Sequence, residues 1–124
     1  MAGQNHHFSG SAPEPIPYAK SRYVFEAKRH FGIVDARLAQ HRYMLGDAYT
    51  IVDIALWGWS RLVPYVIGDD AWPAFPHVKR HLDEINARPA VARVNALRER
   101  FKFKTENDDE ARRHMFGHLA EPVA

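Results

Sequence analysis

The chain has 124 residues, of which 46% are hydrophobic and 12% aromatic, a composition that excludes a disordered protein and allows one domain around one core. It contains no cysteine, so disulfides, thiolate metal sites and cysteine nucleophiles are all excluded. No apolar run is long enough to span a membrane and the N-terminus lacks a signal-peptide pattern, so we expect a soluble cytoplasmic protein.

The formal net charge of +2 is unevenly distributed. Residues 79–104 carry eight basic and three acidic side chains, but Asp83, Glu84 and Glu99 interrupt the basic run. Because the run lies on amphipathic segments, we interpret it as a solvated helix face and expect no binding of nucleic acid.

The first 17 residues predict the end of a helix followed by a loop. Segment 3–8, GQNHHF, suits the last turn of a helix, and segment 9–17 holds three of the eight prolines, which favour an extended loop. A helix from about residue 18 to 39 follows, because apolar residues recur at helical spacing. These residues are Tyr23, Ala27, Phe31, Val34 and Leu38.

The next helix is the one around which we expect the domain to be organised. Thr50 and Asp53 have the spacing of a capping box, in which the Thr50 hydroxyl accepts the Asp53 N–H and the Asp53 carboxylate accepts the Thr50 N–H. Asp53 is the only charged residue from 48 to 60, so the helix should be buried on nearly all sides. We therefore assign Asp53 a structural role, and Asp53→Ala should cost about 1–2 kcal/mol through loss of the cap.

Three aromatic side chains, Phe25, Trp57 and Trp59, are predicted to belong to the core, although one of them could face a hydrophobic cosubstrate pocket. Two further helices follow. Pro76 opens a helix that ends at Arg88-Pro89, and Pro89 opens another that runs to about Phe101. Their expected inward residues are Val78, Leu82, Ile85, Val91, Val94 and Leu97.

The last segment, 105–124, is charged and weakly periodic, so we predict a frayed helix or a mobile tail. No stretch alternates in the manner of a strand. The predicted fold is therefore all-α, with a helical domain over residues 18–104 preceded by the helix end and loop of residues 1–17.

Several of these segments together resemble the C-terminal helical domain of glutathione transferases of the nu class, a group also described as glutathione-dependent disulfide-bond oxidoreductases. GQNHHF and IPYxxxRY are specific to this group, whereas the capped helix and the Arg-Pro-Ala turn are general to the superfamily. The matching segments are GQNHHF at 3–8, IPYAKSRY at 16–23, YMLGDAYTIVDIALWGW at 43–59 and FPHVKRHLDEINARPAV at 75–91.

The resemblance implies a homodimer of two-domain subunits that uses glutathione as a cosubstrate with a small electrophile or a disulfide. In that family a thioredoxin-like domain binds glutathione and acts on its sulfur, and the helical domain forms the other wall of the cleft. The sequence contains no thioredoxin-like pattern. We therefore expect this chain to be inactive alone, as a truncated remnant, a protein with an upstream start, or one half of a split protein.

The resemblance also supplies the candidate binding residues. Arg22 matches the arginine of IPYxxxRY and is expected to contact a glutathione carboxylate, with a plain surface arginine as the alternative. Tyr18 could donate a hydroxyl in the same cleft, whereas Tyr23 lies on the apolar stripe and suits the core. His7 is expected to line the cleft or to pack; His6 and His7 cannot share a metal ion because adjacent helical residues point to different faces.

Two histidine pairs have helical spacing, His77 with His81 and His114 with His118. Neither has the glutamate or the third ligand of a zinc site, so we interpret both as incidental surface pairs and expect no metal and no catalytic residue in this chain. The alternative to a glutathione-related role is a non-catalytic helical module for protein–protein interaction.

Overall fold

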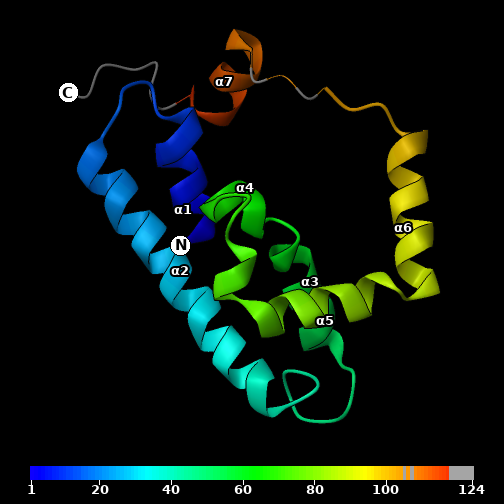
Figure 1. Ribbon diagram of the computed structural model, residues 1–124. Coiled ribbons are helices and arrows are strands. Elements are labelled where there is room, and N and C mark those ends of the chain that lie inside the picture. Colours follow the sequence, from blue (N-terminus) through cyan, green and yellow to red (C-terminus); the bar gives the residue numbers. More distant parts are fainter. Residues whose placement is uncertain (105, 107, 118–124) are drawn as a thin grey trace. The chain divides into compact units, whose positions relative to one another are not determined.

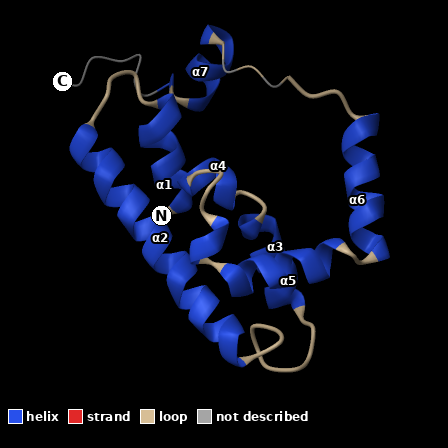
Figure 2. Cartoon of the chain, in the orientation of Figure 1, coloured by secondary structure: helices blue, strands red, loops and turns tan. Residues whose placement is uncertain are grey.

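The computed structural model describes residues 1–104, 106 and 108–117, and these are helices joined by loops (Figures 1 and 2). Within these residues there is no strand, only an isolated bridge between Tyr43 and Gly46, so the predicted all-α fold is confirmed. The elements are α1 (Ala2–His6), the π-helix η1 (His7–Ser11), α2 (Pro17–Gln40), α3 (Ile51–Ser60), α4 (Val63–Ile67), the 3₁₀-helix η2 (Trp72–Ala74), α5 (Pro76–Asn86), α6 (Pro89–Arg100) and α7 (Asp109–Met115).

The chain divides into two compact units, Met1–Ala92 and Arg93–Ala124, and each is described by itself. No helix of the described residues has both the length and the apolar character that crossing a lipid bilayer requires. The main core of the first unit gathers side chains from α2, α4, the loop before η2 and the start of α5. It consists of Phe31, Leu38, Val63, Ala71, Phe75 and Val78.

Helix α2 starts at Pro17 and ends at Gln40, within one residue of the predicted limits. Proline suits the first turn because its missing N–H has no partner there. Of the predicted stripe, Ala27, Phe31 and Leu38 are buried. Before α2, the predicted loop is shorter than expected, because the π-helix continues to Ser11 and the backbone becomes extended only at Ala12.

Helix α5 is held to the end of α2 by two polar contacts that local sequence patterns did not reveal. The Asp35 carboxylate of α2 accepts the backbone N–H groups of His77 and Val78, with N to Oδ1 distances of 2.8 and 2.9 Å. The Arg80 guanidinium of α5 donates to the carbonyls of Leu38 and His41 at 3.0 and 3.2 Å. Because these groups would otherwise be free helix ends, each helix satisfies the terminus of the other.

Helix α3 begins with the predicted capping box, which is confirmed. The Thr50 hydroxyl accepts the Val52 N–H at 3.3 Å, and the Asp53 carboxylate accepts the Thr50 N–H at 2.8 Å. The prediction that α3 is buried on nearly all sides is wrong, because Ile51 is 78% and Trp59 55% exposed. Helix α5 covers only the side that carries Asp53.

The exposed side of α3 also corrects the predicted aromatic core. Phe25 and Trp59 are exposed, whereas Trp57 is half-buried and its indole N–H donates to the Asn86 side chain at 2.8 Å. Only Trp57 therefore has the packed position predicted for all three.

Helix α6 begins at Pro89 as predicted and ends at Arg100. Val91 is buried with Tyr43 and Ile85 in a small second cluster of the first unit. Val94 and Leu97, which were expected to point inward, are exposed. In the second unit, part of the predicted tail forms α7, where the Asp108 carboxylate caps the helix by accepting the Ala111 N–H at 2.9 Å.

Candidate functional site

The segment that precedes α2 is fixed to the first unit by a buried amide. Asn5 is fully buried; its side-chain nitrogen donates to the Val66 carbonyl of α4, and its side-chain oxygen accepts the Ser9 hydroxyl at 3.0 Å. The adjacent His6 ring packs against the Tyr65 ring of α4 with centroids 4.9 Å apart. These contacts explain why the segment GQNHHF holds a defined position although it is short.

The His7 side chain follows on the π-helix, a geometry that often occurs at functional sites. Its ring meets Phe8 edge to face at 5.0 Å, and Phe8 in turn stacks on Tyr23 of α2 with the two rings only 4° from parallel. Tyr23 is half-buried in this stack, which favours the packing role over a ligand role. His7 therefore belongs to the aromatic contact between η1 and α2.

Tyr18 and Arg22 lie one turn apart on α2, so their side chains share a face of that helix. Both are exposed, Tyr18 by 79%. Arg22 lies close enough to Glu26 that its charge assists the Arg29 hydrogen bond in holding the pKa of the Glu26 carboxyl below its usual value. The side chains of Tyr18 and Arg22 can thus meet a ligand or another chain without repacking of the core.

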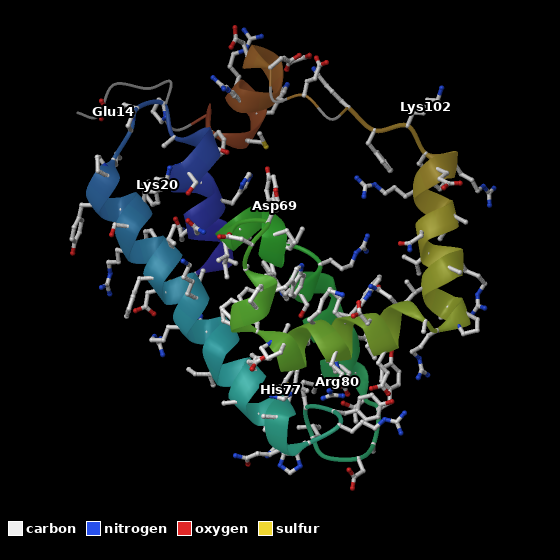
Figure 3. All side chains as sticks on the ribbon, in the orientation of Figure 1. Glu14, Lys20, Asp69, His77, Arg80 and Lys102 are labelled. Atoms are coloured by element: carbon white, nitrogen blue, oxygen red, sulfur yellow. The ribbon has the colours of Figure 1, made fainter. Side chains whose placement is uncertain are left out.

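A hollow of about 440 Å³ lies between η1, the proline-rich loop and the first turn of α2. Its walls include Phe8, Ile16 and two charged residues, Glu14 and Lys20 (Figure 3). Lys20 was not singled out from the sequence, although it lies within the segment IPYAKSRY two residues before Arg22. The hollow depends on how the proline-rich loop turns, and the sequence pattern does not give that turn.

A second polar cluster lies between α3 and α5. The Asp53 carboxylate accepts the N–H groups of Met44 and Thr50 at 2.9 and 2.8 Å, and its Oδ1 lies 3.0 Å from Nε2 of His81. Asp53 and His81 are both fully buried. The interpretation of His77 and His81 as a surface pair is therefore wrong for His81, because it is the buried partner of Asp53.

Burial raises the pKa of the Asp53 carboxyl, but the hydrogen bonds from Met44, Thr50 and His81 outweigh it and leave the pKa below its usual value. Both carboxylate oxygens are already bonded and shielded from solvent, so the cluster is structural. Among the described residues no group of three histidine or carboxylate side chains could hold a metal ion. His118, of the second predicted pair, lies outside the described residues.

The comparison with known proteins identifies the family of the chain. The family described as glutathione S-transferase, C-terminal domain, matches residues 19–89. The chain belongs to this family. The disulfide-bond oxidoreductase YghU of Escherichia coli K12 is 41% identical to this GST C-terminal domain over 101 residues, which cover 75% of the chain and 34% of YghU.

Solved structures resemble the chain over a similar range. Ure2p, solved in complex with glutathione, has a TM-score of 0.69 and 32% identity and covers 75% of this chain and 44% of its own. A glutathione transferase from Burkholderia graminis was solved with two glutathione molecules per subunit. It has a TM-score of 0.66 and 36% identity, and the match covers 75% of this chain and 41% of the transferase. The GST C-terminal domain described here thus spans less than half the length of these relatives.

Proposed function

We propose that this GST C-terminal domain forms one wall of a glutathione-binding cleft. The observation that carries the proposal is the placement of Tyr18 and Arg22 on one exposed face of α2. Two structural relatives were solved with glutathione bound, which supports a ligand of this kind. His7 contributes to the cleft through its ring, next to Phe8.

The charges of glutathione suit these side chains. Each of its two carboxylates is an acceptor for a cation, and the planar Arg22 guanidinium can bind one of them through two parallel hydrogen bonds. Tyr18, one turn earlier on the same face of α2, offers a hydroxyl donor. These residues would bind and orient the tripeptide.

None of the candidate residues is placed to activate a thiol, so we propose that the chain is inactive alone. In the family, glutathione is transferred to an electrophile or used to reduce a disulfide, and the thioredoxin-like domain supplies the groups that act on the sulfur. This domain would complement such a partner within a cytoplasmic homodimer. Residues 18–104 would form the functional helical domain, with residues 1–17 and 105–124 as its flanking segments.

The test is glutathione binding by the purified 124-residue chain, measured by calorimetry, for the parent, Arg22→Ala and Arg29→Ala. Arg29 is the matched control because it is an exposed arginine two turns further along α2, paired with Glu26 at 2.8 Å. We expect Arg22→Ala to weaken binding at least about tenfold, the effect of losing about 1.4 kcal/mol, and Arg29→Ala to leave it unchanged. Equal loss in both variants would reject a specific Arg22 contact.

Turnover is measured in the same preparations with a disulfide and with an electrophile. We expect none from the chain alone and recovery when a thioredoxin-like domain is added. Turnover by the chain alone would contradict the assignment of the chemistry to another domain.

The second candidate function is a non-catalytic interaction module. The exposed apolar side of α3 favours it, because apolar patches on a protein surface commonly mark docking sites. A chain that binds no glutathione but forms a stable complex with another protein would support the module over the glutathione role.

A further inference from the structure

The fully buried side chain of Asn5 joins two separate segments of the first unit. Its amide nitrogen donates to the carbonyl of Val66 in the last turn of α4, and its amide oxygen accepts the Ser9 hydroxyl of η1 at 3.0 Å. The last carbonyls of a helix have no partner within that helix, so Asn5 supplies a donor that the end of α4 lacks. Both partners belong to the same unit, so the burial of Asn5 is a property of this chain itself.

These two bonds use both polar groups of the Asn5 amide. A carbonyl only accepts, so Val66 requires the amide nitrogen, and the remaining oxygen is left for the Ser9 hydroxyl. Aspartate has nearly the same size and shape but has no donor for Val66, so the position is specific for an amide. With both groups bonded and no exposed surface, Asn5 acts on a ligand only through the residues that it holds.

The first of these residues belong to the π-helix η1. Its backbone is wider than an α-helix, because the Ala12 N–H donates to the carbonyl five residues earlier, that of His7, at 2.8 Å. Such turns are rare and short, and a return to the α-helical register would rotate the following side chains by about 100°. The bond from Ser9 to Asn5 therefore ties the middle of η1 to a side chain that is itself fixed on α4.

Helix η1 carries the rings that meet α2, and Figure 1 shows α1 beside both α2 and α4. Phe8 stacks on Tyr23 with ring centroids 5.3 Å apart, and the His7 ring meets Phe8 edge to face. Tyr23 is the neighbour of Arg22 in α2. A shift of η1 would therefore break the stack and move His7 relative to the face of α2 that carries Arg22.

We propose that Asn5 is a positioning residue for the glutathione cleft: it anchors η1 to α4 and so places the His7 and Phe8 rings against α2. The inference rests on the proposed function, because it assigns His7 to the wall of that cleft. It adds a residue that touches no ligand and whose effect passes through the Ser9 bond and the stack of Phe8 on Tyr23.

The first test is the nuclear Overhauser contact between the Phe8 and Tyr23 rings in the 124-residue chain. We expect it in the parent and its loss in Asn5→Ala and in the nearly isosteric Asn5→Asp. Asp35→Ala is the matched control, because it removes a buried polar contact at the other end of α2 and should keep the ring contact.

A milder pair of variants keeps the test valid if the Asn5 variants do not fold. Ser9→Ala removes only the hydroxyl that Asn5 accepts and leaves the bond to Val66, so the ring contact should weaken. Ser9→Thr keeps a hydroxyl and should retain the contact.

The second test is glutathione binding measured by calorimetry. Asn5→Ala should raise the dissociation constant at least about threefold, and Asp35→Ala should leave it unchanged. If Asn5 acts by placing His7, then Asn5→Ala should add almost nothing in a chain that already carries His7→Ala, since the two changes then share one effect. General destabilisation would not produce this non-additivity.

Three results would overturn the inference: a ring contact that persists in the folded Asn5 variants or in Ser9→Ala, an equal loss of the contact in Asp35→Ala, or additive losses of binding for Asn5→Ala and His7→Ala. A parent chain that binds no glutathione would instead reject the proposed function. The ring contact would then decide by itself whether Asn5 places η1 against α2.

Discussion

The side of α3 that faces α5 is polar and buried, whereas the opposite side is apolar and exposed. Asp53 and Ser60 have no accessible surface, while Ile51 and Trp59 are exposed by more than half. Hydrophobicity alone would favour burial of Ile51 and Trp59. Because Leu56 and Trp57 also pack on the covered side, the hydrogen bonds of Asp53 and these two apolar contacts together fix the orientation of α3 in the first unit.

The bonds of Asp53 explain how a carboxylate can face the interior. Its oxygens accept two backbone N–H groups, from Met44 and Thr50, and also bond the Thr50 hydroxyl at 3.1 Å and His81 at 3.0 Å. A buried charge is tolerated when its lone pairs are satisfied in this way. The apolar side of α3 has no such partners among the described residues and is exposed.

The largest expected effect comes from Asp53→Ala, which removes the carboxylate from the buried polar side of α3. The substitution leaves the buried donors of Met44, Thr50 and His81 without an acceptor, so we expect a loss of about 3–5 kcal/mol in the free energy of unfolding. This exceeds the loss of about 1–2 kcal/mol expected for a cap alone. Urea denaturation measures it, with Asp47→Ala, an exposed carboxylate, as the control within about 0.5 kcal/mol. A loss below about 1 kcal/mol would contradict the network.

The pH dependence of stability is a second test of the contribution of the Asp53 carboxylate. Because the pKa of Asp53 is lower in the folded chain than its usual value of 3.8, its contribution is complete above pH 3.8 and is lost as the pH falls through the lower, folded value. Three other carboxyls also have lowered pKa values, so part of the stability lost in acid does not come from Asp53. They are Glu26, Glu84 and Asp108. The parent should therefore lose more stability below about pH 4 than Asp53→Asn does, measured by denaturation at each pH. If the free energy of unfolding of the parent and of Asp53→Asn fell in parallel as the pH decreased, Asp53 would not be the group whose protonation lowers the stability.

The next largest effect is expected from Asp35→Ala. Asp35 is a second inward-facing carboxylate, and it caps the start of α5. Its removal leaves the His77 and Val78 N–H groups at the start of α5 without an acceptor, so we expect a loss of about 1–2 kcal/mol. Asp35→Asn keeps one oxygen acceptor and should recover most of the loss. If the alanine and asparagine variants were equally unstable, the cap would not be the cause.

Local spacing predicted the parts of the fold whose partners are close in sequence. The capping box of Thr50 and Asp53 spans three residues, and prolines at 76 and 89 mark the starts of helices, so these features could be predicted. The bonds from Asp53 to His81 and from Asp35 to His77 join residues 28 and 42 apart. No periodic pattern encodes such pairs, which is why His81 was assigned to the surface.

The prediction that α3 is buried on nearly all sides failed for a different physical reason. An apolar helix predicts burial only if enough chain surrounds it, and the described residues cover one side of α3. For the candidate site, helical spacing placed Tyr18 and Arg22 together, but their relation to glutathione came from family resemblance. Lys20 was missed because the hollow it lines depends on the path of the proline-rich loop.

The smallest expected effect is that of Ile51→Ala, which tests the apolar side of α3. In dilute solution this side chain is 78% exposed, so its truncation should change the free energy of unfolding by no more than about 0.5 kcal/mol. Ile85→Ala is the matched control: Ile85 is only 1% exposed, and the same change there should cost about 2–5 kcal/mol through a cavity. Thermal denaturation of both variants measures the two losses. A large loss in Ile51→Ala would contradict the exposed position of this side chain.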